Sequence, residues 1–159
     1  MTDLPIDVLL RLTVAVVCGA VMGLHIGLIG RPGGLRAHIL TTAGAALFCV
    51  TSQRLAGESS EALRAVQGIA SGVGFIGAAA VLRDGRSVRG IATGASLWIA
   101  AAVGCSAGFG DLLLAFTASA FIAVVNVATF YIDRRWIAPA PLAPHARHDA
   151  DDDGRAPER

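Results

Sequence analysis

The sequence contains no lysine, and its 13 basic residues are all arginines. We attribute this absence to the codon usage of a GC-rich genome rather than to chemistry. The formal net charge is only +1, which argues against a protein that binds nucleic acid. In contrast, 54% of the 159 residues are apolar. They are gathered in long runs separated by arginines, which is the pattern of a membrane protein rather than of a soluble core.

Carboxylates are missing from the interior of these apolar runs. Every aspartate and glutamate lies in a loop, at the end of a run or in the C-terminal tail. A protein that dehydrates Mg²⁺ or relays cations ordinarily needs carboxylates that face a cavity at membrane depth. The sequence therefore disfavours a dedicated magnesium channel.

Catalytic and metal-binding motifs are also lacking. Cys18, Cys49 and Cys105 have neither CxxC spacing nor partnered histidines, so we expect buried apolar filler rather than a metal site or a disulfide. We find no pairing of a nucleophile with a base and no phosphate-binding loop. We therefore predict no catalytic residues, no metal, no cofactor and no enzymatic activity.

Five apolar runs reach the length of about 20 residues with which a helix crosses a bilayer. The predicted spans are residues 6–30, 35–53, 65–82, 90–108 and 112–132. Asp7 and Arg11 lie one helical turn apart, so they can pair at the interface. We predict an all-α, polytopic membrane domain over residues 1–135. Residues 136–159 are too rich in proline, alanine and charge to pack, so we expect a disordered cytoplasmic tail.

Glycines recur at every fourth position in several of the predicted spans. This spacing forms a groove along one helix face and lets a neighbouring backbone approach closely. Because lipid tails are as apolar as leucine, close packing must hold such helices together. We therefore expect a compact bundle of five helices that can also self-associate. The glycines assigned to helix packing are Gly68, Gly72, Gly74, Gly77, Gly90 and Gly94, and the same spacing marks Gly19, Gly23, Gly27, Gly104 and Gly108.

Two amides lie within the predicted spans, where an unpaired polar group is costly. Most of the other polar groups there are hydroxyls, which can bond to the backbone of their own helix. The side-chain amides of Gln67 and Asn126 are costlier in lipid, because their hydrogen-bonding groups are not met so simply by the backbone of their own helix. We expect both amides to form hydrogen bonds between helices.

The arginines are distributed unequally between the two sides of the predicted membrane domain. The side with the 1–2 loop, the 3–4 loop and the C-terminus carries most of them, and positive residues stay cytoplasmic, so the N-terminus should face the periplasm. We expect His38 to be solvated on this side. The cluster either fixes the orientation and contacts anionic lipids or binds an anion or an acidic partner surface. Its members are Arg31, Arg36, His38, Arg83, Arg86 and Arg89, with Arg36 and Arg89 as the favoured pair.

Three motifs in the same order resemble the MgtC/SapB family. Residues 64–78 read RAVQGIASGVGFIGA and resemble the family signature in the third span. LR at residues 82–83, SVRGIAT at residues 87–93 and LW at residues 97–98 continue it. GRPGGLRAH at residues 30–38 resembles the family's first cytoplasmic loop. The resemblance covers roughly residues 8–130, and where family members usually carry Glu-Arg-Glu this chain has His25-Ile26-Gly27.

The resemblance implies a bacterial inner-membrane protein without an established transport reaction. The family is associated in pathogens with growth at low magnesium and with survival inside macrophages. We therefore expect a regulatory or partner-binding protein that acts through its cytoplasmic arginines. A transporter or channel for a small solute or ion is the alternative, and a structural subunit of a larger complex is a third option. The expected partners are membrane lipid, a second copy of the chain or another inner-membrane protein.

The topology prediction can be tested with reporter fusions. A reporter fused after Ile132 or placed in the 3–4 loop should read cytoplasmic, because these positions lie on the arginine-rich side. A reporter placed between Arg54 and Arg64 should read periplasmic. A periplasmic signal after Ile132 would remove the arrangement of five spans with an external N-terminus.

Overall fold

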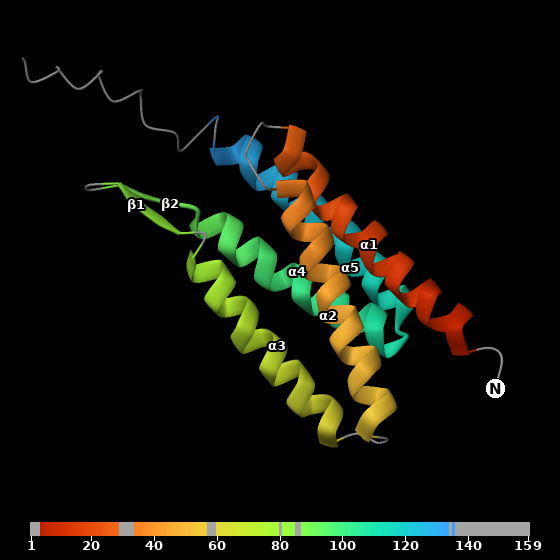
Figure 1. Ribbon diagram of the computed structural model, residues 1–159. Coiled ribbons are helices and arrows are strands. Elements are labelled where there is room, and N and C mark those ends of the chain that lie inside the picture. The colour runs from red at the N-terminus through yellow and green to blue at the C-terminus, as the bar shows by residue number, and fades with distance from the viewer. Residues whose placement is uncertain are drawn as a thin grey trace, which may run out of the picture.

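The computed structural model describes residues 4–28, 34–56, 60–79, 81–84, 87–133 and 135. Over these residues the chain forms five long helices and one short antiparallel hairpin (Figure 1). In chain order they are α1 (Leu4–Leu28), α2 (Gly34–Ala56), α3 (Ser60–Ala79), β1 (Leu82–Asp84), β2 (Ser87–Arg89), α4 (Ile91–Phe109) and α5 (Leu112–Ile132). Each helix is long and apolar enough to cross a membrane. The predicted fold of five helices able to span a membrane is confirmed, whereas the predicted tail lies outside the described residues.

The ends of the second and third helices differ from the predicted spans. α2 continues to Ala56, and α3 begins at Ser60 rather than Ala65. Arg54, near the end of α2, and Arg64, near the start of α3, therefore lie within helices, because the first and last turns of a membrane helix reach into the polar interface. The third helix also ends at Ala79, before the predicted limit at Leu82, because Leu82 already belongs to β1.

The helices form a bundle with α4 at its centre and α3 on its flank. α1 packs against α2 and α5, and α2 packs between α1 and α4, whereas α3 contacts only α4 and α2 to any extent. In the most apolar stretch of α4, 56% of the residues are buried, against 11% in α3 and in α5. The main core consists of small and medium side chains: Val14, Ala15, Cys18, Met22, Ala46, Ala100, Val103, Ala107 and Ala115.

Glycines on two helices face α2 directly. A Cβ atom added to Gly19 of α1 would lie 2.8 Å from the backbone oxygen of His38, and one added to Gly108 of α4 would lie 2.6 Å from that of Ala46. Real Cβ atoms do not approach a carbonyl oxygen so closely, so the backbones are in direct contact. α2 is thus held between a glycine-bearing face of α1 and one of α4, as expected for packing in lipid.

Among the other assigned glycines, two join α3 to α4. A Cβ atom on Gly94 would lie 2.7 Å from the carbonyl oxygen of Gly77, so these glycines pack as predicted. Gly90 has a different role, because its φ of 92° lies in the left-handed region at the start of α4. A residue with a Cβ atom would be strained there.

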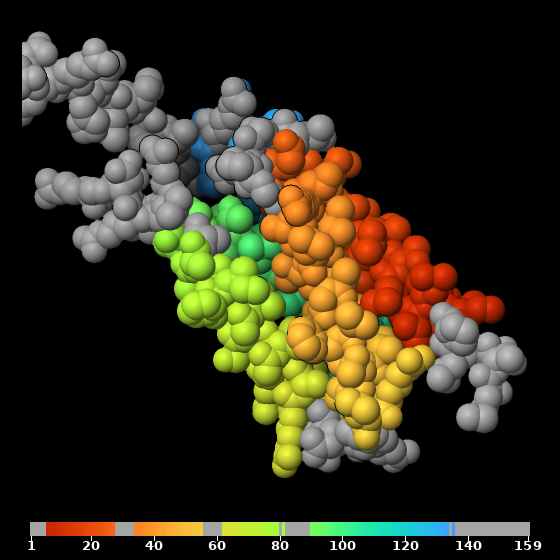
Figure 2. All heavy atoms as spheres, viewed as in Figure 1, coloured from red at the N-terminus to blue at the C-terminus, as the bar shows by residue number. Residues whose placement is uncertain are grey.

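The packing role predicted for Gly68, Gly72 and Gly74 is wrong within the chain. A Cβ atom on any of the three would meet nothing within 4 Å. Glycine spacing marks a face that could accept a close neighbour, but it does not reveal whether a helix of the same chain covers that face. Gly68 and Gly72 instead line an open apolar groove of about 860 Å³ between α2 and α3. Figure 2 shows the two helices parting along this side, with α4 visible between them.

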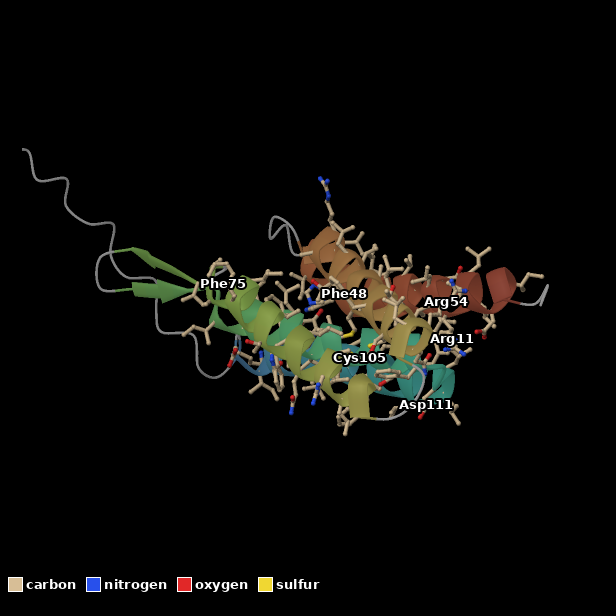
Figure 3. The ribbon with its side chains drawn as sticks, turned by 60° about the horizontal axis from the view of Figure 1, so that its bottom comes forward. Arg11, Phe48, Arg54, Phe75, Cys105 and Asp111 are labelled. Atoms are coloured by element: carbon tan, nitrogen blue, oxygen red, sulfur yellow. The ribbon has the colours of Figure 1, made fainter. Side chains whose placement is uncertain are left out.

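A polar contact holds the end of the bundle opposite the hairpin. The predicted pair of Arg11 and Asp7 is present, with 2.9 Å between Nε and Oδ2. Arg11 also donates from Nη1 to Oε1 of Gln53 at 2.9 Å and to the backbone oxygen of Gly108 at 3.0 Å. One side chain therefore joins α1 to α2 and α4. In Figure 3 this side chain lies at the same end of the molecule as Arg54 and Asp111.

The three cysteines are free and buried, as predicted for apolar filler. Cys18 belongs to the main core. Cys49 of α2 and Cys105 of α4 belong to a second cluster with Ala45, Val73 and Ala101. These small side chains allow α2 and α4 to pack closely against each other.

A pair of glycine variants tests this packing. Gly94→Leu should lower the free energy of unfolding by about 2 kcal/mol, because the added side chain must displace the backbone of α3. Gly72→Leu should change it by less than about 0.5 kcal/mol, because the site is open. Unfolding in mixed detergent micelles measures both values. Equal destabilisation by the two substitutions would contradict the arrangement of α3.

Candidate functional site

The predicted functional residues belong to one end of the bundle, which we call the hairpin end. There α1 and α5 finish, α2 and α4 begin, and the β1–β2 hairpin extends past the helices (Figure 1). In the hairpin Leu82 pairs with Arg89, and Arg83 pairs with Val88. From the sequence this segment is expected to be a loop. The Asp-Gly sequence at residues 84–85, where β1 ends, is a turn signal that could have revealed the hairpin.

The structure brings the favoured arginine pair to this same end. Arg36 lies on the first turn of α2 and is exposed. The backbone of Arg89 ends β2, directly before the first turn of α4, and that of Arg83 lies in β1. Arg31 and Arg86 fall outside the described residues. The described arginines of the cluster therefore lie either at the start of α2 or in the hairpin that precedes α4.

His38 does not belong to this basic surface. It was expected to be solvated, but its side chain is completely buried. The ring lies where α2 passes the glycine face of α1, and a Cβ atom on Gly23 would be only 3.0 Å from that of His38. Glycine at that position leaves room for the imidazole between the helices. Sequence position alone placed His38 near the interface, but the small residues opposite it determine its burial.

The buried imidazole is satisfied by hydrogen bonds at both nitrogens. Nδ1 lies 2.6 Å from the backbone oxygen of Gly34, and Nε2 lies 2.7 Å from Oγ of Ser96 on α4. A carbonyl oxygen only accepts, so Nδ1 carries the proton that it donates. In the neutral ring Nε2 then accepts from the Ser96 hydroxyl. This bond ties the second turn of α2 to the second turn of α4.

A third helix joins the network through Asn126. Its Nδ2 donates to Oγ of Ser96 at 3.4 Å, which links α5 to α4. The interhelical role expected for Asn126 is therefore present. Gln67, the other amide assigned this role, is exposed on α3. It makes no hydrogen bond to another residue in the described part of the chain.

A small polar pocket of about 150 Å³ adjoins this network at the hairpin end. Sequence reasoning did not identify it, because its walls come from three helices that are distant in the chain. The signal available was a polar residue near the end of each of two apolar spans, His25 and Asn126. The lining residues are His25 and Ile26 of α1, Ala92, Thr93 and Ser96 of α4, and Asn126, Thr129, Phe130 and Asp133 at the end of α5.

His25 is the unusual member of the pocket. Its Nε2 atom is buried and has no hydrogen-bond partner in the described structure. The ring packs edge-on against Phe130 with 5.2 Å between centroids, and Tyr131 lies at 6.5 Å. A buried polar atom without a partner is uncommon in proteins, because leaving it unpaired costs about 1–3 kcal/mol.

Comparison with known proteins identifies the family. A sequence model of the MgtC family matches residues 12–135, which is most of the chain. The protein belongs to the MgtC family. This membership and the five apolar helices make it a bacterial membrane protein.

Several curated relatives share this part of the sequence. Protein MgtC of Brucella abortus is 41% identical over 112 residues, which cover 70% of this chain and 47% of the relative. Protein MgtC of Salmonella typhimurium is 35% identical over 119 residues, covering 75% and 51%. Protein SrpB of Synechococcus elongatus is 42% identical over 113 residues, covering 63% and 62%. The chain thus spans about half the length of most of these relatives, and no solved structure matches it.

The network around Ser96 predicts an effect on stability. Ser96→Ala should lower the free energy of unfolding by about 1–3 kcal/mol, because it leaves buried Nε2 of His38 without a donor. Ser106→Ala is the matched control, since that hydroxyl bonds only to Ala102 of its own helix. Unfolding in mixed micelles should show a change below about 0.5 kcal/mol for the control. If Ser96→Ala behaves like the control, the interhelical network does not stabilise the bundle.

Proposed function

We propose that this protein is a regulatory or partner-binding protein of the bacterial inner membrane that acts through its basic face. The face comprises Arg31, Arg36, Arg83, Arg86 and Arg89, without His38. Its ligand would be an anionic group on a partner protein or on a lipid. Guanidinium groups suit this role because they bind carboxylate or phosphate oxygens with two parallel hydrogen bonds.

The observation that carries the proposal is the pairing of two helix starts. The bond from Ser96 to His38 holds the second turns of α2 and α4 together, next to the starts of both helices. Arg36 and Arg89, which are far apart in the sequence, are thereby brought to the same end of the bundle. The helix N-termini add partial positive charge there. A partner with an acidic surface would meet arginines from two helices and a hairpin together.

The proposed orientation places this face in the cytoplasm and the N-terminus in the periplasm. The hairpin end has a clear excess of arginines, and positive residues are retained on the cytoplasmic side. At the opposite end, Arg11 is neutralised by Asp7 and is engaged in contacts within the bundle.

Membership of the MgtC family suggests under which growth conditions the protein acts. The family's association with low magnesium and intracellular survival suggests that the basic face acts when magnesium is limiting. The groups described at the hairpin end include no cluster of three or more metal-binding side chains. We therefore propose a role in regulation rather than direct magnesium handling, and flux assays with reconstituted vesicles test the alternative of a transporter.

Arginine variants test the basic face. Arg36→Ala combined with Arg89→Ala should leave the protein inserted but abolish complementation of growth at limiting magnesium in a strain that lacks the gene. The single variant Arg89→Lys should give less than half of the complementation of the unchanged protein, because lysine keeps the charge but loses the planar pair of donors. Arg54→Ala, an exposed arginine at the opposite end, is the control.

Two outcomes would count against this proposal. Full complementation by the double variant would show that the basic face serves only to orient the protein. Ion or solute flux through vesicles that contain the purified protein, at a rate above that of empty vesicles, would favour a transporter. Amounts of protein in the membrane fraction must be matched across the variants in both assays.

A further inference from the structure

The polar pocket at the hairpin end has properties of a binding site that the basic face does not explain. It lies between α1, α4 and α5, and it combines an imidazole, three hydroxyls, an amide and a carboxylate with the apolar side chains of Ile26, Ala92 and Phe130. Its volume of about 150 Å³ corresponds to roughly five water molecules. It can therefore accept only a small group.

Several hydrogens on the pocket's polar groups are already committed to the protein. The Ser96 hydroxyl donates to Nε2 of His38, and Asn126 donates to Ser96. Thr129 donates to backbone oxygens of its own helix, at 2.7 Å to Val125 and 3.2 Å to Asn126. The Ser96 and Thr129 hydroxyls therefore offer a ligand lone pairs on oxygen, and the side-chain oxygen of Asn126 is a further acceptor.

Two further groups of the pocket, Asp133 and His25, add acceptors. Asp133 at the pocket's outer edge contributes a carboxylate, which is an acceptor with a negative charge. His25 contributes buried Nε2, which lacks a partner in the described structure. In the neutral ring with its proton on Nδ1, this atom also accepts. A small cation with hydrogens to donate would satisfy these groups together.

The composition of the pocket favours an ammonium group over a metal ion. Sodium, potassium and magnesium ions prefer oxygen ligands, so they would leave the His25 nitrogen unused. A transition metal would need more ligands, and no group of three His, Cys, Asp or Glu residues occurs in the described chain. A primary ammonium group carries three N–H donors. The ring of Phe130 can also stabilise an adjacent organic cation.

We propose that this pocket binds a primary ammonium group, with Asp133, His25 and Asn126 as its acceptors. Asp133 lies exposed at the end of α5 and His25 lies in the last turn of α1. This is the level at which a membrane helix meets lipid headgroups. The ammonium group therefore belongs either to an ethanolamine headgroup of the bilayer or to a small soluble amine.

The experiment uses the full chain in lipid nanodiscs. Native mass spectrometry should show phosphatidylethanolamine retained in preference to phosphatidylcholine, because the quaternary headgroup of the latter has no N–H to donate. Asp133→Asn and His25→Leu should each reduce this preference roughly tenfold, the usual effect of losing a charged hydrogen bond. His25→Gln, which retains an acceptor, should keep most of it.

Asp111→Asn is the matched control. It removes one carboxylate at the opposite end of the bundle, where Oδ1 of Asp111 accepts from the backbone N–H of Leu114. Asparagine caps a helix as well as aspartate does, so fold and lipid preference should both be unchanged. Asp133 is exposed, so its variant tests the site even if His25→Leu fails to fold.

A second arm distinguishes the source of the amine. Here free ethanolamine is added to the protein in nanodiscs of phosphatidylcholine alone. Binding of ethanolamine there, with no enrichment of phosphatidylethanolamine in the mixed nanodiscs, would identify a soluble ligand, and the reverse result would identify the lipid. Equal retention of both lipids without ethanolamine binding would overturn the proposal, as would equal competition by sodium or potassium ions. The alanine variants of Arg36 and Arg89 should bind the ammonium group normally, so this test is independent of the basic face.

Discussion

The close approach of α2 to α1 and α4 is the contact on which the rest of the structure depends. Within a bilayer, apolar side chains gain little by leaving lipid for one another, so the helices need another source of attraction. Here it comes from backbone contact, because Gly19 of α1 and Gly108 of α4 both present bare Cα atoms to α2. A larger residue at either position would separate the helices by the thickness of a side chain.

Both ends of the bundle follow from this contact. At the hairpin end, close spacing places the ring of His38 within reach of Ser96, and Ser96 within reach of Asn126. Three helices then share one buried polar network, and the pocket forms where α1 and α5 end beside it. At the other end, the same spacing lets a single arginine reach Gln53 and the backbone of Gly108. α3 makes its close backbone contact with α4, through Gly77 and Gly94, and has none with α2, where the open groove lies.

The features that could be predicted from the sequence are those determined by local pattern. Apolar runs of sufficient length predicted five helices, and the Asp7–Arg11 spacing predicted an ion pair. The burial of His38 could not be predicted, because it depends on Gly23 and Ser96, which lie on other helices. Similarly, Gly72 and Gly94 look equivalent in the sequence, yet only Gly94 faces another helix. The pattern shows that a face is small, whereas the tertiary arrangement decides what covers it.

The contacts of Arg11 have a consequence for the order of events during biosynthesis. The chain enters the membrane from its N-terminus, so α1 is inserted long before Gly108 has been synthesised, 97 residues later in the sequence. At first the arginine can bond only to neighbours in its own helix, and Asp7 lies one turn away. Gln53 becomes available when α2 has been made, and Gly108 only when α4 has followed. The carboxylate thus pairs with the charge from the start and remains its partner in the finished bundle, while the bonds that fasten α1 to α2 and α4 are added in the order of synthesis.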